Sequence, residues 1–573
     1  MGGSFRPAPF ALSPSQTPQI YSWVYVSPFP FPVESSPAAP GSSLSMRAVL
    51  TSAVALILVA SVAAQPHLTP QGNSSIQTNP AVIGGTMNFT VNGQPNALWL
   101  VAVDIAPGSI NVGIGTVYIA LSPFWFTPLS AFAGTAPPLG GSGTLTLPVP
   151  IAGTDGTAIY VQVLATDGAG IAFSNAKSIV FSDPDSYDAT STVMTEARAF
   201  HRCEVLPNGA YLAIGGGAGQ FLSPVATAGC DRYDPYLRTW TADAPMSTPR
   251  TLHTCTTLQD GRILATGGSI TGGIGLGSTE IYDPATSTWS AGPALNSSLP
   301  ANACLPQPSV NARIAHAATL LNDGRVLITG GTSSFNTPVG STNYFCIFEG
   351  ALDTAEVFDP TTNTSTPLPA MNARRFAHAQ VLLTDGRVLI TGGVRGGQSL
   401  FGVAAPLYAQ TDEIFDPTTN TFSPVPAMSV PRVTHTLNVM SDGRVMGIGG
   451  AGGTLVVSLA STEIFNPATN TWSAGPAIPG ATQGIALHAT TNLPDGSLYV
   501  AGGAFGAVGS FNALDLAWRY TVTGGFTMLA NLPTARQAPT GVWTPEGVLI
   551  VGGGGGGGMG ATVDTSSIWT PPL

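Results

Sequence analysis

Short runs of hydrophobic residues that end in two glycines recur along the C-terminal two thirds of the chain. Each run places four mostly apolar residues before the glycine pair, as in VLITGG, and successive pairs are 50 to 63 residues apart. Apolar, β-branched runs bounded by turn residues predict strands, and a period of about 50 residues is typical of propeller blades. The pairs begin at Gly215, Gly267, Gly330, Gly392, Gly449, Gly502 and Gly552. The pattern therefore predicts seven repeated β units.

Each unit has the same internal order of turns. A pair such as Asp260-Gly261 precedes the double-glycine strand and supplies the positive φ angles of a two-residue hairpin. A loop of variable length follows the glycines and leads to a strand that ends in an acidic residue and proline, as in IYDPATSTW. The aromatic residue after this turn begins a fourth strand at Trp240, Trp289, Phe422 and Trp472. Four antiparallel strands in each of seven units predict a closed propeller.

The glycine pair, the Tyr/Phe-Asp-Pro turn and the tryptophan resemble kelch repeats, especially those of bacterial exported proteins. The resemblance covers residues 187–573 and implies an all-β, seven-bladed kelch β-propeller. It weakens in the sixth unit, which has LDLAWRYTVTGG in place of the acidic turn, and in the seventh, which ends at SSIWTPPL.

The propeller, residues 184–573, begins with a fragment that matches the missing part of the seventh unit. Residues 187–198, YDATSTVMTEAR, align with the end of a third strand and with a fourth strand. We expect residues near Val193 to pair with the last strand at Ile568, so that the propeller is closed by its N-terminal strand. Such pairing protects two free strand edges.

Three further segments precede the propeller. Residues 65–183 contain β runs such as TMNFTVNG and AIYVQVLATD between Gly/Pro clusters, which predict a small antiparallel β-sandwich similar to immunoglobulin-like domains. Residues 46–64 combine one arginine, a short apolar run and small residues before Gln65, which predicts a cleaved signal peptide; the alternative is a membrane anchor. Residues 1–45 are rich in Pro and Ser and are interpreted as a disordered or mis-assigned extension.

Composition narrows the set of partners. The net charge is −11, charged residues make up 9% of the chain, and Lys177 is the single lysine, so nucleic acid is not an expected partner. We expect a secreted, periplasmic or cell-surface protein with no stable membrane span after signal cleavage. In that environment Cys304 and Cys346, in two loops of the third unit, are predicted to form a disulfide; the pairing of the other three cysteines stays open.

Five units share the motif Arg-x-x-His before their innermost strand. The sixth keeps His488 without the arginine, and the seventh keeps Arg536 with Pro539 in place of histidine. A histidine ring that binds metal is one interpretation. We favour the other, in which each histidine lies between blades and bonds backbone there, because strand side chains alternate between faces that both pack on neighbouring blades. No metal and no cofactor are therefore expected.

The arginines of this motif are the candidate binding residues. They precede the innermost strands, at the end of the propeller that also carries the variable loops, and they are predicted to ring the mouth of the channel and take an anionic ligand. The alternative is structural: each guanidinium bonds the carbonyls of its own blade. The six residues are Arg198, Arg250, Arg313, Arg375, Arg432 and Arg536.

Two functions follow from the resemblance. The first is a non-catalytic secreted protein that presents loops such as 331–355 and 394–410 to a protein or glycan partner. The second is a carbohydrate-active enzyme, either mutarotase-like or a diverged oxidase, with its site at the arginine-lined mouth. Copper-radical oxidases such as galactose oxidase share the scaffold but use a Tyr-His pair, and no histidine of this chain follows a tyrosine. Binding is therefore the favoured prediction, and no catalytic residue is assigned.

Overall fold

The structure is a computed structural model, and the part of the chain that it describes consists of strands and their connections. Before residue 184 it describes only the backbone of eleven strands. From there on it describes every residue except 221–222, 236, 297, 300–308, 334, 336–349, 401–402, 508–509, 556–560 and 572–573. The predicted signal segment and the predicted disulfide between Cys304 and Cys346 lie outside the described residues. None of the described elements is a helix that could cross a membrane.

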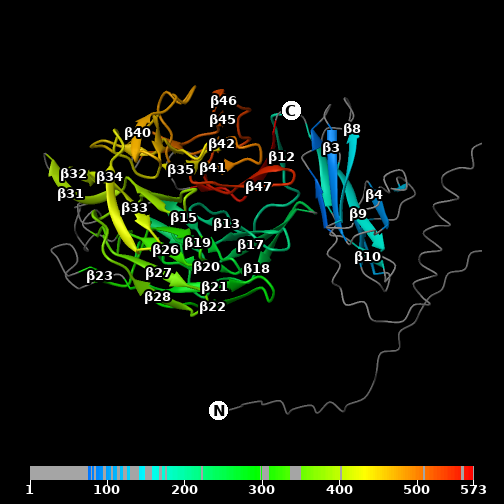
Figure 1. Cartoon of the computed structure of the whole chain (residues 1–573), viewed down its shortest axis with the longest axis horizontal. Coiled ribbons are helices and arrows are strands. Elements are labelled where there is room, and N and C mark those ends of the chain that lie inside the picture. Colours follow the sequence, from blue (N-terminus) through cyan, green and yellow to red (C-terminus); the bar gives the residue numbers. More distant parts are fainter. Residues whose placement is uncertain are drawn as a thin grey trace, which may run out of the picture. The chain divides into compact units, whose positions relative to one another are not determined.

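Seven four-stranded antiparallel sheets form the blades of a propeller, as the repeat predicts (Figure 1). From the innermost strand outward they are blade 1, β13 (Arg202–Val205), β14 (Tyr211–Ile214), β17 (Cys230–Asp234) and β18 (Thr239–Asp243); blade 2, β19 (Thr254–Thr257), β20 (Ile263–Thr266), β21 (Thr279–Asp283) and β22 (Thr288–Ala291); blade 3, β25 (Ala317–Leu320), β26 (Val326–Thr329), β27 (Ala355–Asp359) and β28 (Thr364–Pro367); blade 4, β29 (Ala379–Leu382), β30 (Val388–Thr391), β33 (Thr411–Asp416) and β34 (Thr421–Pro426); blade 5, β35 (Thr436–Val439), β36 (Val445–Ile448), β39 (Thr462–Asn466) and β40 (Thr471–Ala474); blade 6, β41 (Ala489–Asn492), β42 (Leu498–Ala501), β45 (Ala517–Thr521) and β46 (Gly525–Met528); and blade 7, β47 (Thr540–Thr544), β48 (Gly547–Val551), β51 (Ser566–Thr570) and β12 (Ser186–Ala189).

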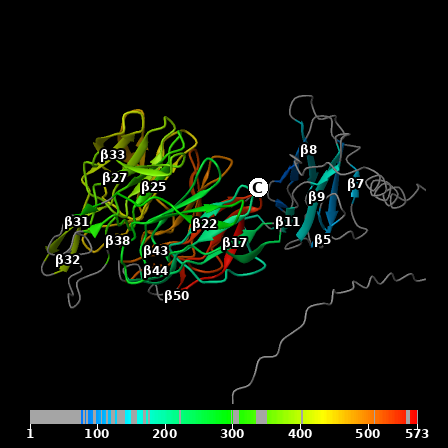
Figure 2. The ribbon, with the colours of Figure 1, turned by 90° about the horizontal axis from the view of Figure 1, so that it is seen from below.

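The first strands of neighbouring blades contact one another around the whole ring, including β47 with β13. They therefore line the central channel. Each glycine pair ends a second strand at the same end of the blade where the first strand begins, and short hairpins follow most of these pairs (Figure 2). We call this end of the propeller the hairpin face. Its hairpins are β15–β16 (Gly217–Gln220 and Ser223–Ala226), β31–β32 (Val394–Leu400 and Val403–Tyr408), β37–β38 (Ala451–Gly452 and Val457–Ser458), β43–β44 (Ala504–Phe505 and Asn512–Ala513) and β49–β50 (Gly554–Gly555 and Ala561–Thr562); β23–β24 (Ser298–Leu299 and Ser309–Val310) precedes blade 3.

The core of the propeller lies between blades rather than in one centre. Seven clusters of buried apolar residues each span two consecutive blades, for example Leu212 and Ile214 of blade 1 with Ile263 and Ala265 of blade 2. Since each blade buries both faces, its second strand has four buried residues in a row instead of an alternating pattern. This is why the runs before the glycine pairs are continuously hydrophobic.

The strand that precedes blade 1 completes blade 7. β12 pairs antiparallel with β51, with Tyr187 opposite Trp569 and Asp188 opposite Ile568. The alignment of the sequence fragment placed this pairing near Val193, and that detail is wrong. Val193 is 49% exposed, and the paired residues lie a few positions earlier in the chain. The fragment thus supplies the outermost strand of the last blade.

The strands before residue 184 form two main sheets and a separate two-stranded hairpin. All pairs are antiparallel except β11 with β2. Their packing into an immunoglobulin-like sandwich stays a prediction. The first sheet is β1 (Ser75–Thr78), β3 (Thr86–Gly93) and β8 (Gly141–Pro148); the second is β2 (Ala81–Val82), β11 (Lys177–Ser182), β9 (Ala158–Thr166), β4 (Leu98–Asp104) and β7 (Phe126–Pro128), with β10 (Ile171–Phe173) beside β9; the hairpin is β5 (Pro107–Asn111) and β6 (Thr116–Ile119).

Candidate functional site

The six arginines of the repeated motif lie inside the blades. All are between 0 and 1% exposed. Arg313 shows the arrangement: its Nη1 donates to the carbonyl oxygens of Gly330 (2.6 Å) and Thr354 (3.0 Å), and its Nε donates to the Glu356 carboxylate (2.8 Å). The guanidinium therefore joins the end of the second strand to the start of the third strand within one blade.

A buried acid on the third strand accompanies five of these arginines. It lies three residues before the last residue of the strand in each case, as in TEIYD. A charge-assisted bond of this kind offsets much of the cost of burying both charges when other hydrogen bonds support it. The carbonyl contacts satisfy most of the remaining donors, while Nε of Arg250, Nε of Arg375 and Nη2 of Arg313 have no partner among the described residues. The pairs are Arg198–Asp231 (2.5 Å), Arg250–Glu280 (2.7 Å), Arg313–Glu356 (2.8 Å), Arg375–Glu413 (2.7 Å) and Arg432–Glu463 (2.8 Å).

The last two blades depart from this rule in different ways. In blade 6 both partners are replaced together, because Ile485 stands at the arginine position and Trp518 at the acid position, and both are fully buried. In blade 7 the arginine is kept as Arg536, but Ser567 occupies the position of the acid. The Arg536 guanidinium donates to Gly552 and Thr565 instead of to a carboxylate. Burial lowers the pKa of Arg536 to about 10.

These contacts correct the expectation of an arginine-lined mouth. An arginine that is 0% exposed and bonded to carbonyls and a carboxylate of its own blade presents no donor to a ligand in the channel. The structural alternative describes the positions and partners of Arg198, Arg250, Arg313, Arg375, Arg432 and Arg536. The signal that separates the two alternatives was in the sequence: a carboxylate at a fixed place in the same blade.

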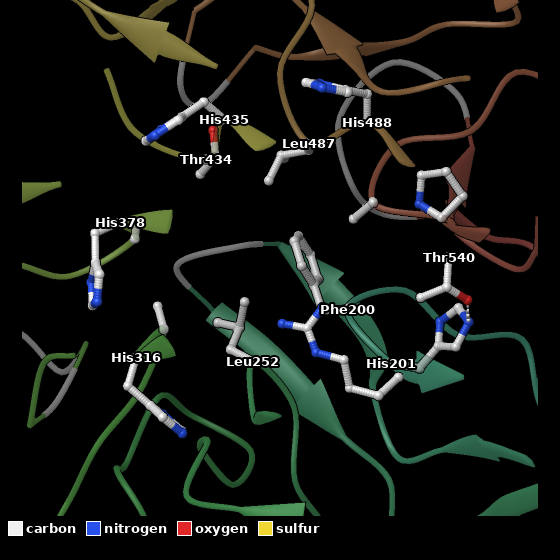
Figure 3. A pocket seen from close by; sticks show the side chains of 15 residues that line it. Phe200, His201, Leu252, His316, His378, Thr434, His435, Leu487, His488 and Thr540 are labelled. Carbon is white, nitrogen blue, oxygen red and sulfur yellow. Dashed lines mark hydrogen bonds between the residues drawn. The ribbon is translucent and has the colours of Figure 1, made fainter. Parts of the chain in front are cut away.

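The histidines three positions after the arginines lie between blades. Nε2 of His316 is 2.9 Å from the hydroxyl of Thr254 in the preceding blade, and Nε2 of His201 is 2.8 Å from Thr540 in blade 7 (Figure 3). The bonds thus go to threonine hydroxyls rather than to backbone. The same contact occurs for His378 with Thr329, His435 with Thr391 and His488 with Thr436.

Burial keeps these histidines neutral. Desolvation lowers the pKa of His316 to about 3, with a further contribution from the Arg313 charge, and desolvation alone lowers the pKa of His488 to about 3. The pKa of His201 also lies well below its ordinary value, for the same first cause. In the described part of the chain, no three His, Cys, Asp or Glu side chains gather as a metal site would require.

The double glycine of each blade packs against the segment of the next blade that carries the arginine and histidine positions. Gly267 has φ +56°, and a Cβ atom there would lie 2.5 Å from the carbonyl oxygen of Arg313 and 3.0 Å from Cε1 of His316. The next residue, Gly268, donates its N–H to the same Arg313 carbonyl at 2.8 Å. A side chain at the first position would separate the two blades, so glycine is required there by both backbone and space.

The central channel contains a cavity of about 220 Å³. The residue before each histidine position lines this cavity, and all seven of these residues have left-handed backbone with φ between 50° and 54°. Main-chain hydrogen bonds connect five successive pairs of these residues, from Ala315 N–H to Leu252 O (3.2 Å) through Ala538 N–H to Leu487 O (2.8 Å). Side chains of this ring surround the opening in Figure 3: Phe200, Leu252, Thr434 and Leu487.

One blade differs from the others at the channel. The innermost strand of blade 1 reads RCEV, whereas the other six read TCTT, AATL, AQVL, TLNV, ATTN and TGVWT. Arg202 and Glu204 are therefore the charged residues of the innermost strands, and Arg202 lines the cavity. The asymmetry is visible in the sequence when the seven innermost strands are compared.

Comparison with known proteins agrees with the repeat pattern. The Kelch motif model matches residues 249–296, the second unit of the ring. This match supports a kelch-repeat scaffold. An F-box/kelch-repeat protein of Arabidopsis thaliana is 38% identical over 72 residues, which are 13% of this chain and 19% of the relative.

A galactose oxidase of Gibberella zeae is 27% identical to this chain over 272 residues, which are 38% of each chain. The chain thus matches well under half the length of this relative. Two solved structures are also similar to parts of the chain. A fungal alcohol oxidase of the AA5 family, in complex with copper, is 17% identical with a TM-score of 0.47, covering 68% of this chain and 76% of its own. YjhT is 15% identical with a TM-score of 0.41, covering 66% and 96%.

Proposed function

We propose that this kelch protein is a secreted binding protein that holds a protein or glycan partner on its hairpin face. The observation that carries the proposal is a set of exposed apolar side chains on that face. Val225 is 52% exposed, Ile274 49%, Leu455 66% and Val457 40%, and all four lie in the connections that follow glycine pairs. Exposed apolar side chains are candidates for contact with a partner, because binding removes them from water.

The connections on the hairpin face differ in sequence and length, but each one begins with the same β-bridge. In each blade the residue after the arginine position forms a β-bridge with the start of the connection, as Phe376 does with Val394 and Val433 with Ala451. The connections therefore leave the ring from fixed positions. Their sequences and lengths differ from blade to blade, which gives the face the asymmetry that a specific site needs. Export through the predicted signal segment would place this face outside the cell.

Matched substitutions on the two ends of the propeller test the proposal. Leu455→Ser and Val225→Ser remove apolar surface from the hairpin face, and Val205→Ser removes a side chain of similar exposure (46%) from the far end of β13. A glycan and peptide array probed with the full chain should show ligands whose signal falls in the first two variants and is unchanged in the third. Equal signals in all three variants would contradict the proposed face.

A carbohydrate-active enzyme is the second candidate. It is favoured by the stretch of 272 residues that is similar to galactose oxidase. Aldose oxidation would be measured as hydrogen peroxide release after incubation with copper, and anomer interconversion by NMR. Turnover of a sugar by the wild-type chain would favour this candidate over binding alone.

A further inference from the structure

We propose that the central channel of the propeller holds a carboxylate at Arg202, a ligand site separate from the hairpin face. Arg202 begins the innermost strand of blade 1 and is exposed to the channel cavity of about 220 Å³. That volume lies below the range of about 300 to 1,000 Å³ for sites of drug-sized ligands. The ligand is accordingly a small organic acid or a single acidic side chain of a partner.

The cavity has one charged side chain among its fifteen lining residues. The other lining groups are apolar residues, threonines, a proline and histidines. The histidines that line the cavity have lowered pKa values because they are buried, so their imidazoles are neutral. A lone guanidinium in a neutral, partly apolar channel attracts an anion more strongly than one in open solvent.

The Arg202 guanidinium retains unused donors. Its Nε donates to the carbonyl oxygen of His253 at 3.1 Å, and within the described residues Arg202 has no carboxylate within the 4.0 Å of an ion pair. Guanidinium carries five N–H donors, so both Nη groups are available for a bidentate pair with a carboxylate. This contrasts with Arg198 on the same blade, whose Nη2 is bonded to Asp231.

The positive charge of Arg202 influences histidines in neighbouring blades. It contributes to lowering the pKa of His201, His253 and His316, which belong to three consecutive blades. The nearest carboxyl of its own strand, Glu204, is half-buried and accepts the Thr257 hydroxyl at 2.7 Å. Desolvation raises the pKa of this carboxyl. The Arg202 charge acts on this carboxyl and lowers its pKa in part, but in the described part of the chain the two side chains form no ion pair within 4.0 Å.

Titration of the full chain with acetate, and with its neutral analogue acetamide, tests the site. A blocked Gly-Asp-Gly peptide, with Gly-Asn-Gly as its control, distinguishes a free acid from an acidic side chain. We expect acetate or the aspartyl peptide to bind, and its neutral analogue not to bind. Arg202→Gln should weaken that binding about tenfold or more, because a hydrogen-bonded charge pair is lost. Arg202→Lys keeps the charge but loses the two-pronged guanidinium geometry, so its affinity should lie between those of the wild type and Arg202→Gln.

Arg262→Gln is the matched control, since Arg262 pairs with Asp260 in a turn at the opposite end of blade 2. It should leave binding unchanged. Unaltered binding in Arg202→Gln, equal binding of acetate and acetamide, or no binding of any probe at tens of millimolar would overturn the inference. Should Arg202→Gln fail to fold, as judged by thermal unfolding, Arg202→Lys decides between the outcomes. Loss of this site would leave hairpin-face binding intact, so the two proposals fail separately.

Discussion

The peptide N–H of Gly553 in blade 7 donates a 2.8 Å hydrogen bond to the carbonyl oxygen of Arg198, just before blade 1. The same bond joins the second glycine of every blade to the next blade, with Ile485 replacing arginine as the acceptor in blade 6. The acceptor is main chain, so it survives loss of the arginine side chain. The glycine pair and the Arg-x-x-His motif are therefore two halves of one interblade joint.

Gly267→Ala should destabilise the propeller more than Gly272→Ala. Both glycines have positive φ, which costs alanine about 1–2 kcal/mol, but a Cβ at Gly272 would meet nothing within 4 Å, whereas at Gly267 it would meet the Arg313 carbonyl at 2.5 Å. We expect a loss of about 3 kcal/mol in the free energy of unfolding for Gly267→Ala, because the clash adds to the strain. Urea unfolding measures both values. Equal losses would mean that the joint tolerates a methyl group.

Arg375→Ala should cost about 3–5 kcal/mol of stability, because it leaves the Glu413 carboxylate buried without its partner. Both side chains are fully buried. The control is Arg387→Ala, whose pair with Asp385 is partly exposed and should contribute at most about 1 kcal/mol. Thermal or urea unfolding compares the two. A stable Arg375→Ala chain that had lost ligand binding would restore the original expectation of a binding arginine.

Blade 6 suggests the rescue of that variant. Arg375→Ile combined with Glu413→Trp reproduces the pair Ile485 and Trp518, which pack in the apolar core between blades 5 and 6. Replacing a buried ion pair by apolar residues of similar volume is often neutral. The double variant should thus be more stable than Arg375→Ala alone in the same unfolding experiment. A double variant that is less stable would show that the surroundings of blade 4 do not accept the larger ring.

Stability should fall as pH falls from 7 to 5. The six buried histidines have native pKa values below the ordinary 6.5, so the unfolded chain binds more protons in this range. Their contribution is complete above pH 6.5 and is lost toward pH 3, by about 1.4 kcal/mol per pH unit for each histidine that protonates only on unfolding.

Two variants check the source of this pH dependence. His316→Gln should flatten the dependence of unfolding free energy on pH, since one titrating site is removed. Asp412 has the opposite effect on the pH dependence of stability. Burial raises the pKa of its carboxyl to about 6 in the folded chain. Between about pH 4 and 6 the folded chain therefore binds a proton at this carboxyl that the unfolded chain does not bind. Asp412→Asn should therefore steepen the loss. A dependence that neither variant alters would point to other groups.

The closing strand is held in part by one hydroxyl pair. Tyr187 of β12 and Tyr499 of blade 6 share a 2.7 Å hydrogen bond, and Tyr499 is fully buried. Tyr187→Phe should cost about 1–3 kcal/mol, because it leaves the Tyr499 hydroxyl unsatisfied. The double variant with Tyr499→Phe should recover most of the loss, since no orphan hydroxyl remains. Additive losses in the double-mutant cycle would contradict a direct bond.

The repeat made the propeller predictable from the sequence. Its turn pairs, glycine pairs and aromatic residues are local signals that recur, and recurrence excludes most other folds. The register of closure was harder to predict, because the fragment YDATSTV resembles both the end of a third strand and a fourth strand. Pairing of Tyr187 with Trp569 depends on contacts with blades 6 and 7 that sequence similarity does not encode.

The candidate site was less predictable for a related reason. Arg198 and Arg202 are four residues apart, yet the first is buried against Asp231 and the second lines the channel. Position in the repeat indicates which end of a blade a residue occupies. The acid at a fixed place on the third strand identifies the buried arginines, because it recurs with them in five blades. Arg202 has no counterpart in the other six innermost strands, so the repeat gives no indication of its role.

The interblade joints all run in one rotational sense, with each glycine donating forward to the following blade. The ring is therefore closed by seven equivalent main-chain hydrogen bonds, one at each junction between blades. Breaking the contact at any one junction would open the ring. The apolar faces of the two blades at that junction would then be exposed to water. A substitution at a single junction, such as a methyl group on Gly267, should consequently lower the stability of the whole propeller rather than that of one blade.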